Sequence, residues 1–465
     1  MTYKDNSKSE VITENKMGIM PVGRLVFTMS LPAMISMLIH ALYNIVDSVF
    51  VAQLGEEALA AVTIVFPLQM FFISVAVGTG IGVNSLIARR LGARLYEEAN
   101  QAAAHGMVLS LFNWFFFALM GIFLTVPFVG FFTDDSLTHL YGVQYCFVVL
   151  TFSTLPTFFA IMVEKIFQAT GNMIYPMIIS MVGAIINIIL DPILIFGLLG
   201  APRMEVLGAA IATVVGELAS LSLAVFYLLL KEHDVKISLK KFRFQAAILK
   251  NIYQVGFPSI VMQSIGSVML TGFNAILAGF SESALAVLGV YFRLQSFIFM
   301  PVFGINQGSM PIMGYNYGAQ NKQRLMRTFK VSFSAALAIM ALGLVIFQVF
   351  PEPLLRLFNA SDEMMNIGVR ALRIISLSFV PAAFGIVCSA FFQATGYGMF
   401  SLWVSLLRQM VIILPLAWIL AKTHGVNHVW FSFPLSEIGD IIACVFFMLY
   451  IYRKDIINMK SPETS

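Results

Sequence analysis

Residues 58–71 read ALAAVTIVFPLQMF, and a closely similar stretch, ALAVLGVYFRLQSF, follows at residues 284–297. The two stretches align without a gap at a shift of 226 positions, and seven of their fourteen residues are identical. The tetrapeptide QATG at residues 168–171 recurs at residues 393–396, a shift of 225. The shift of 226 also relates a proline and four small residues to counterparts: Pro32 to Pro258, Gly78 to Gly304, Gly82 to Gly308, Gly92 to Gly318 and Ala93 to Ala319. Matches that keep the same shift over so much of the sequence indicate that the chain arose by duplication of one unit.

The composition places both copies in a membrane. Of the 465 residues, 59% are hydrophobic and 11% are charged, whereas about a quarter of the residues of a soluble domain are charged. Apolar runs of about twenty residues recur, and each is long enough to cross the hydrocarbon core as a helix. These features exclude a soluble enzyme, a nucleic-acid-binding module and a disordered scaffold. The solid apolar runs also exclude an outer-membrane barrel, whose strands alternate.

We therefore predict an all-α integral membrane protein with twelve transmembrane helices. The first six cover residues 24–51, 58–86, 103–128, 140–165, 173–198 and 207–230, and the second six cover 250–278, 284–312, 329–350, 367–391, 399–421 and 430–452. The predicted parts are an N-terminal tail (1–23), a first six-helix lobe (24–230), a linker (231–249), a second lobe (250–452) and a C-terminal tail (453–465).

Lysine and arginine gather at one set of helix ends. They occur in both tails, in the linker and around residues 89–94 and 322–330, whereas acidic pairs such as those at 56–57 and 134–135 stand at the opposite ends. The positive-inside rule then predicts that both termini are cytoplasmic. Because each half has an even number of spans, both halves insert the same way up, as in transporters built of parallel repeats. Two similar bundles that can rock against each other are typical of a transporter that works by alternating access.

Polar side chains on the first span mark a candidate site, since an ionisable group at membrane depth is costly and usually functional. His40, Tyr43, Asn44 and Asp47 follow i, i+3, i+4, i+7 spacing and share one helix face. We expect that face to point into the bundle and to line a substrate cavity. For His40 the alternative is a role in helix packing.

The fifth span adds a second polar pair, because Asn187 and Asp191 are four residues apart and also share a face. Thr213 in the sixth span and Glu164 in the fourth are placed in the same cavity. Carboxylates gathered in a small desolvated site suit the uptake and release of a proton, or closure around a cation. Two alternatives stay open: Asp47 and Asp191 form a buried structural pair, or Asp191 lies near the outer end in contact with water.

The second half lacks this acidic set. The repeat places Phe273, Ile412, Leu416 and Ser389 at the positions of Asp47, Asn187, Asp191 and Glu164. Glu217 and Glu437 are counterparts, which we interpret as scaffold or gate elements.

Three further residues are assigned to the substrate cavity: Gln69, Arg293 and Gln295. Gln69 and Gln295 occupy the same position in the two aligned stretches. Arg293 is expected either to pair with a carboxylate across the cleft or to snorkel toward the interface. The chain also holds 27 Met and 43 Phe, and flexible thioethers and aromatic faces can repack around varied lipophilic cations.

The run LP…NIVDSVFVAQLG…ALAAV, the fifth-span NIILDPILIFG and the QATGN and QATGY loops resemble the multidrug and toxic compound extrusion (MATE) family, closest to its bacterial DinF- and MepA-like branch. The resemblance covers roughly residues 20–455 and implies a V-shaped pair of lobes that exchange drugs for H⁺ or Na⁺. It also implies that Asp47, Asn187 and Asp191 form the coupling site, with Thr213 as a further member. Gly266 stands where NorM-like members carry a glutamate, so we expect coupling in the first lobe.

We therefore expect a cation-coupled antiporter that exports lipophilic, often cationic drugs or toxic compounds. H⁺ or Na⁺ is the expected coupling ion, with no other cofactor, and Na⁺ would bind at Asp47, Asn187, Asp191 and Thr213. The alternative is a lipid-linked oligosaccharide flippase of the same broader superfamily, whose cavity would be strongly cationic. An enzyme is disfavoured because the six histidines form no HExxH motif. The expected partners are small-molecule drugs and membrane lipid but no nucleic acid, and the expected form is a monomer in the bacterial inner membrane.

Overall fold

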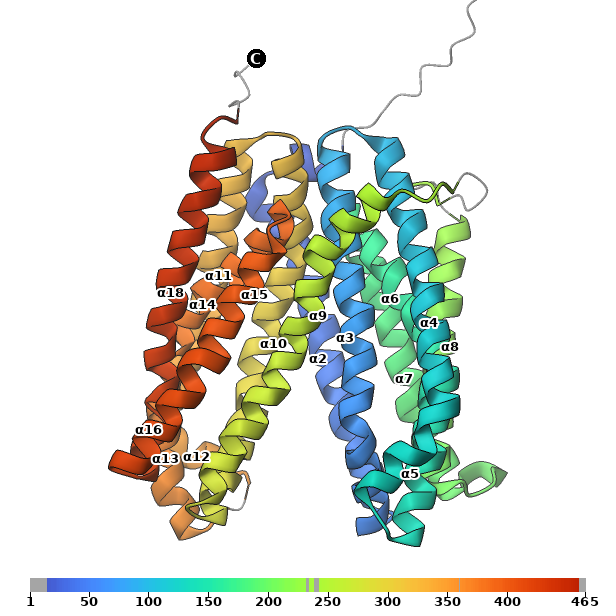
Figure 1. The fold of residues 1–465 in the computed structure, drawn as a ribbon, viewed down its shortest axis with the longest axis vertical. Helices are drawn as coiled ribbons and strands as arrows, with labels where there is room; N and C mark the ends of the chain where they lie inside the picture. The colour runs from blue at the N-terminus through green and yellow to red at the C-terminus, as the bar shows by residue number, and fades with distance from the viewer. Residues whose placement is uncertain (1–14, 231–233, 238–241, 359, 460–465) are drawn as a thin grey trace, which may run out of the picture.

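The computed structural model describes residues 15–230, 234–237, 242–358 and 360–459 (Figure 1). No β-strand occurs in this described part of the chain. Most of the predicted N-terminal tail, parts of the predicted linker and the end of the predicted C-terminal tail lie outside the described residues. The basic residues Lys4, Lys8, Lys231, Lys240 and Lys460 are among those outside.

Helices make up nearly all of the first half. They are α1 (Lys16–Ile19), α2 (Val22–Ala52), α3 (Glu56–Gly92), α4 (Tyr96–Phe132), α5 (Ser136–Val148), the wider π-helical segment η1 (Val149–Ser153), α6 (Thr154–Ala169), α7 (Ile174–Phe196), the 3-10 turn η2 (Leu198–Gly200) and α8 (Glu205–Leu230).

The second half follows the same plan with more interruptions. Its helices are α9 (Ala246–Ala278), α10 (Glu282–Gly318), α11 (Lys322–Val349), α12 (Pro351–Arg356), α13 (Asp362–Ser376), α14 (Phe379–Thr395), α15 (Gly398–Leu406), the π-helical η4 (Leu407–Ile413), α16 (Leu414–His424), α17 (Val426–Val429), α18 (Ser432–Ile451) and the π-helical η5 (Tyr452–Ile456).

The predicted all-helical membrane fold is confirmed. Among the described residues, 11 helices are long and apolar enough to cross a membrane, and the pair α13 and α14, bent by 48°, makes up to 12. That bent pair covers the predicted tenth span. Several helices are longer than predicted, such as α3 with 37 residues, because backbone hydrogen bonds continue past the apolar run into its polar flanks.

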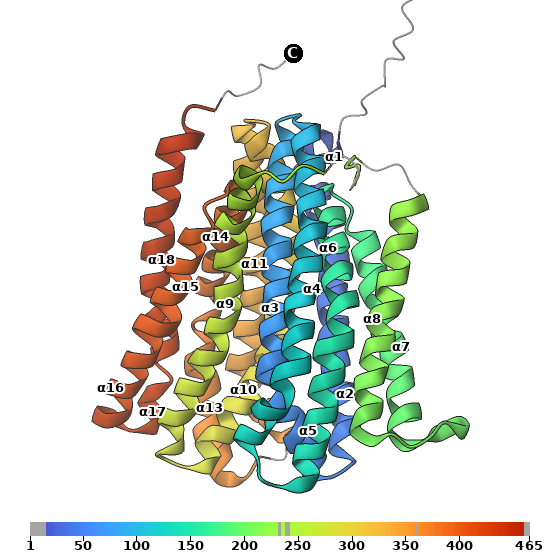
Figure 2. The ribbon, with the colours of Figure 1, turned by 45° about the vertical axis from the view of Figure 1, so that its right-hand side comes forward.

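The helices form two bundles, α2–α8 and α9–α18, that stand side by side (Figures 1 and 2). In Figure 1 the bundles meet at the end where α2 begins and α18 ends, and they diverge toward the end where α5 and α16 lie. We call these the closed end and the open end. The arrangement agrees with the V shape implied by the sequence resemblance.

Glycines of α3 bring the two bundles into backbone contact at the closed end. A Cβ added at Gly82 would lie 3.0 Å from the backbone nitrogen of Gly256 on α9. One added at Gly92 would lie 2.7 Å from the carbonyl carbon of Tyr315 on α10. Ordinary van der Waals contacts of a Cβ begin at about 3.4 Å, so only glycine permits this approach at either position.

Glycines of α10 make the matching contacts with the first bundle. A Cβ at Gly308 would lie 2.7 Å from the backbone nitrogen of Ser30 on α2, and one at Gly318 would lie 2.8 Å from the carbonyl carbon of Arg89 on α3. Positions 256 and 30 differ by 226, and so do positions 315 and 89. The interface between the bundles therefore has the same two-fold relation as the sequence repeat.

The short helix α1 bridges the bundles at the closed end. Met17 is fully buried, and its carbonyl oxygen accepts hydrogen bonds from Asn316 Nδ2 (3.2 Å) and Arg324 Nη2 (3.0 Å) of the second bundle. The Asn15 side chain donates to the Thr170 carbonyl oxygen of the first bundle at 3.0 Å. These bonds fasten the closed end in the observed conformation.

Candidate functional site

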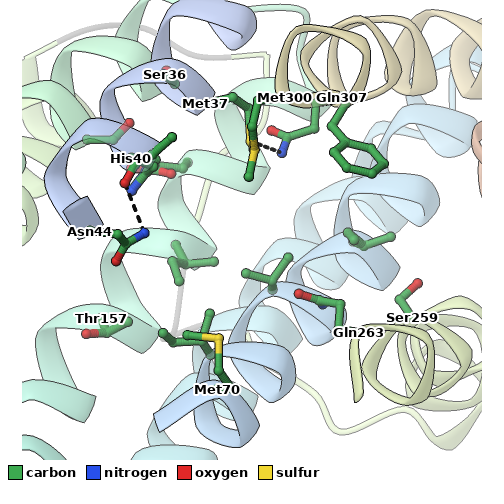
Figure 3. A pocket seen from close by; sticks show the side chains of 18 of the residues that line it. Ser36, Met37, His40, Asn44, Met70, Thr157, Ser259, Gln263, Met300 and Gln307 are labelled. Atoms are coloured by element: carbon green, nitrogen blue, oxygen red, sulfur yellow. Dashed lines mark hydrogen bonds between the residues drawn. The ribbon is translucent and has the colours of Figure 1, made fainter. Parts of the chain in front are cut away.

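A cavity of about 760 Å³ lies between the two bundles. Helices α2, α3, α6, α7 and α8 line it from one side, and α9, α10, α14, α15, η4 and α18 line it from the other. Figure 3 shows His40 and Asn44 of α2 facing Ser259 and Gln263 of α9 across this space. Methionine and phenylalanine side chains supply much of its apolar wall: Met37, Met70, Met262, Met300, Met310, Phe66, Phe72 and Phe303.

The polar face predicted on the first span belongs to the cavity wall. His40, Tyr43, Asn44 and Asp47 of α2 all line the cavity. Asn44 Nδ2 donates to the His40 carbonyl oxygen at 2.9 Å (Figure 3), which turns the Asn44 amide along the helix. The four side chains thus form a polar stripe that descends α2 toward the open end.

Close packing of α7 on α8 builds the other side of the site. A Cβ added at Gly216 would lie 2.8 Å from the Gly183 carbonyl oxygen, and one at Gly208 would lie 2.6 Å from the Leu194 carbonyl oxygen. With no side chain at these glycines, the two helix backbones touch. This approach brings Thr213 of α8 within reach of α7.

Asn187 and Asp191 lie on the face of α7 that meets α8 and α2. Asn187 Nδ2 is 3.4 Å from Thr213 Oγ1 and 3.5 Å from Asp191 Oδ1, both at the long limit of a hydrogen bond. Asp191 has no exposed surface, and its carboxyl group neighbours that of Asp47. The alternative that Asp191 is in contact with water is therefore wrong, and Asp191 sits just behind the cavity wall.

Three buried oxygen atoms in this cluster have no hydrogen-bond partner: Asp47 Oδ1, Asp191 Oδ2 and Asn187 Oδ1. Buried polar atoms are nearly always satisfied. Unpartnered oxygens on two carboxyl groups and one amide form a set that a proton or a small hard cation would complete. The oxygen atoms of this cluster would therefore fit H⁺ or Na⁺.

The fourth span carries a pair of opposite charges in the cavity wall. Glu164 lines the cavity as predicted, and so does Gln69 of α3. Lys165, which the sequence reasoning missed, is 6% exposed and donates from Nζ to Gln168 Oε1 at 3.0 Å. The signal was the lysine next to Glu164 in the run AIMVEKIFQATG, but the predicted span ended at that residue.

The second bundle holds its own charged cluster, on η4 and α18. Arg408 Nη1 lies 3.2 Å from Glu437 Oε1, and Arg408 Nε lies 3.9 Å from Asp440 Oδ1. Gly385 of α14 makes room for this carboxylate, since a Cβ there would lie 3.1 Å from Asp440 Cγ. Arg408 and Asp440 line the cavity, so an internal guanidinium largely neutralises the acids of this bundle.

The counterpart of Asp47 is part of an aromatic core instead. Phe273 is fully buried, with its ring centroid 5.0 Å from that of Phe433 and 6.3 Å from that of Trp430. The two bundles therefore share a fold but differ at this position.

Two residues assigned to the cavity from the sequence, Arg293 and Gln295 of α10, are not among the residues that line it. Arg293 is exposed, and no ion pair between described residues includes it. The snorkelling alternative fits this position better than pairing across the cleft. Within the described residues, no group of three or more His, Cys, Asp and Glu side chains is arranged to hold a metal.

Comparison with known families and proteins bears on what this cavity does. The family model described as MatE matches residues 32–193 and 258–419, two segments related by the same shift of 226. A protein of Shewanella oneidensis named FAD transporter is 28% identical over 92% of this chain and 94% of its own length. The multidrug export protein MepA of Staphylococcus saprophyticus is 26% identical over 91% of this chain and 92% of its own.

Solved structures agree in fold. The outward-facing conformation of a multidrug resistance MATE family transporter aligns with a TM-score of 0.88 at 27% identity, over 95% of this chain and 98% of that one. A transporter from Pyrococcus furiosus, described as having a binding pocket of reverse polarity and a different function, aligns with a TM-score of 0.87 at 26% identity, over 94% and 98% of the two chains. The family model covers well over half of the sequence in both repeats, and the chain belongs to the MatE family of multi-pass membrane transporters, which are not enzymes.

Proposed function

We propose that this protein is an antiporter that exports lipophilic, often cationic drugs or toxic compounds in exchange for H⁺ or Na⁺. The single observation that carries the proposal is the cluster of unpartnered oxygens on Asp47, Asp191 and Asn187, set beside a cavity lined by methionine and phenylalanine. The resemblance to MepA, a multidrug export protein, supports the same substrate class.

Transport of the substrate is coupled to movement of the ion because both compete for the same carboxylates in the first bundle. A cationic substrate near Asp47 and Glu164 gains electrostatic stabilisation only while those carboxylates are free of protons or Na⁺. An ion arriving from the open end would neutralise the carboxylates and weaken binding of the substrate, and this reciprocal linkage is the physical content of antiport. Thr213 and Asn187 supply neutral oxygens that suit Na⁺, whereas the two carboxyl groups alone suffice for H⁺.

The orientation in the membrane is proposed from charge. Arginine and lysine gather at the closed end: Arg89 and Arg90 lie in the last turn of α3, Arg94 follows it, and Lys322 and Arg324 start α11. By the positive-inside rule the closed end and both termini are cytoplasmic, so the observed conformation is open to the outside. We place the protein as a monomer in the bacterial cell membrane, with residues 24–230 and 250–452 acting as the two moving lobes.

Other candidate functions differ in the charge that they need in the cavity. Among the described residues, four carboxylates (Asp47, Glu164, Glu217 and Asp440) and two cations (Lys165 and Arg408) line it. A flippase for lipid-linked oligosaccharides would need the opposite balance, to hold pyrophosphate. The Shewanella relative named FAD transporter makes a dinucleotide the second candidate substrate. Lys165 favours this candidate, since Arg408 is already paired with Glu437 and Asp440.

The direct test is transport by the purified protein in proteoliposomes, with a pH gradient and a Na⁺ gradient imposed separately. Movement of a lipophilic cationic dye is expected against its own concentration gradient when one of the two ion gradients is applied. Dye movement that ignores both gradients would overturn the proposal.

A further inference from the structure

Lys165 is a buried cation with an incomplete set of partners. Its ammonium group has three N–H donors, and the hydrogen bond found for it goes to the neutral Gln168 side chain at 3.0 Å. No ion pair within 4.0 Å between described residues includes Lys165. A buried ammonium group is costly unless it is both paired and hydrogen-bonded, so a further hydrogen-bond acceptor is expected at some stage of the transport cycle.

The fold makes room for this lysine. A Cβ added at Gly80 of α3 would lie 2.7 Å from Lys165 Cγ, so the aliphatic stem of the lysine occupies the space that a side chain on α3 would fill. The Lys165 carbonyl oxygen also accepts a hydrogen bond from Asn84 Nδ2 at 3.0 Å. The stem and backbone are thus held by α3, while the ammonium group reaches the cavity wall.

Neighbouring charges do not remove the need for a partner. Glu164 also lines the cavity, and its carboxylate attracts the Lys165 ammonium group electrostatically. No ion pair within 4.0 Å joins the two residues, so this attraction does not fill the N–H donors of Lys165. The other cation in the wall, Arg408, already lies 3.2 Å from Glu437 and 3.9 Å from Asp440. Lys165 is therefore better placed than Arg408 to bind an anionic group of a ligand.

The position of Lys165 separates it from the ion site. α6 ends at Ala169, four residues beyond Lys165, and it ends at the closed end, whereas Asp47 lies five residues before the opposite end of α2. Lys165 thus lies, beside Glu164, in the part of the cavity nearest the closed end, and Asp47 lies toward the open end. A ligand that spans this space meets opposite charges at its two ends.

We propose that Lys165 binds an anionic oxygen group, a carboxylate or a phosphate, on organic substrates that also carry a lipophilic or cationic part. The inference rests on the proposed transport of organic molecules through this cavity, and it assigns one residue to the anionic part of such a molecule. Gln168 is the residue that positions the ammonium group toward the cavity.

The test compares a rhodamine ethyl ester, which is a lipophilic cation, with the free acid of the same dye, which adds one carboxylate. Binding of both to the purified full-length protein in detergent is measured by fluorescence polarisation. The ratio of their Kd values is taken for the wild-type protein and for Lys165→Met, Lys165→Gln, Lys165→Arg and Lys250→Met. Lys250 is exposed on α9 and does not line the cavity, so its variant controls for loss of charge alone.

Charge-assisted hydrogen bonds are the stronger ones, so both neutral variants are expected to weaken binding of the acid relative to the ester by about tenfold or more. Lys165→Arg is expected to keep most of the wild-type ratio, and Lys250→Met all of it. If Lys165→Met does not elute as a folded monomer, Lys165→Gln carries the test alone. A ratio unchanged in the folded neutral variants, or a wild-type protein that does not bind the acid, overturns the inference. The measurement needs no ion gradient, so failure of coupled export in proteoliposomes would be a separate result.

Discussion

Replacing Gly318 by alanine is expected to shift the protein away from the conformation that is open to the outside. The added Cβ would overlap the Arg89 carbonyl group, with its carbon only 2.8 Å away and the Arg89 Cα 3.0 Å away. Ordinary contact starts at about 3.4 Å, so the two backbones would have to separate by at least 3.4 − 2.8, or about 0.6 Å. No change of side-chain rotamer relieves the overlap, because both partners are backbone.

The overlap raises the free energy of the outward-open conformation only. Overpacking a tight contact costs about 1–3 kcal/mol, and each 1.4 kcal/mol is a factor of ten in an equilibrium. Gly318 and Arg89 belong to different bundles, so the overlap disappears when the bundles part at the closed end. The ratio of inward-open to outward-open protein is therefore expected to rise by about 5- to 140-fold.

A thiol placed in the interface reports this ratio. Ser30 on α2 is 4% exposed and its hydroxyl oxygen has no partner, so Ser30→Cys loses no hydrogen bond. The cysteine should react with a maleimide only when the two bundles have parted at the closed end. The native cysteines Cys146, Cys388 and Cys444 are buried and provide a low background.

The labelling rate of Ser30→Cys is expected to rise by the same factor when Gly318→Ala is added. Gly289→Ala on the same helix is the matched control, since a Cβ there would meet nothing within 4 Å, and its rate should stay at the starting value. An unchanged rate in a folded Gly318→Ala protein would refute the idea that glycine contacts hold the closed end.

Three other expectations follow from the site. Asn44→Cys, on the exposed part of the α2 stripe, should react with a membrane-impermeant maleimide added at the open end, and complete protection in every condition would contradict a water-accessible cavity. Phe273→Asp should not restore coupled transport to an Asp47→Asn protein, because partners equivalent to the fifth-span pair are absent in the second bundle; restored coupling in vesicles would contradict functionally unequal halves. Arg408→Met leaves Glu437 buried without its counter-charge and should destabilise the protein by about 3–5 kcal/mol, which would appear as aggregation at lower temperature, and an unchanged melting temperature would show that the ion pair contributes little.

Much of the fold could be predicted because its determinants are local or repeated. Each span is an apolar run whose length matches the membrane, and the repeat at a shift of 226 fixed the relation between the halves. The positions that touch across the two-fold, such as Gly92 and Gly318, were visible as repeated glycines. Their partners were not, since a backbone contact leaves no pattern of its own in the sequence.

The site was predictable where one helix carries the pattern. Asp47 and His40 share a face because of the helical period alone, and both line the cavity. To predict contacts between helices, one must know how each helix is rotated about its own axis, and the sequence does not give that rotation. For that reason Arg293 was wrongly placed in the cavity, and the pairing of Arg408 with Asp440 was not foreseen.

The most direct test of the coupling mechanism is Asp47→Asn, which keeps the size and hydrogen bonding of the side chain but removes its charge. The protein should insert and fold, since a neutral amide costs less in a membrane than an ion. A lipophilic dye should still bind through the methionine and phenylalanine wall. Asp191→Asn should behave in the same way, and the double variant should be no worse than either single change, because both acids act as one site.

The deciding measurement is dye efflux under an imposed ion gradient, made on the same preparation in which dye binding in detergent is confirmed. The account predicts that the Asp47→Asn protein binds dye but does not move it in response to the gradient. Wild-type efflux by a folded Asp47→Asn protein would contradict the claim that this carboxylate couples the ion to the substrate.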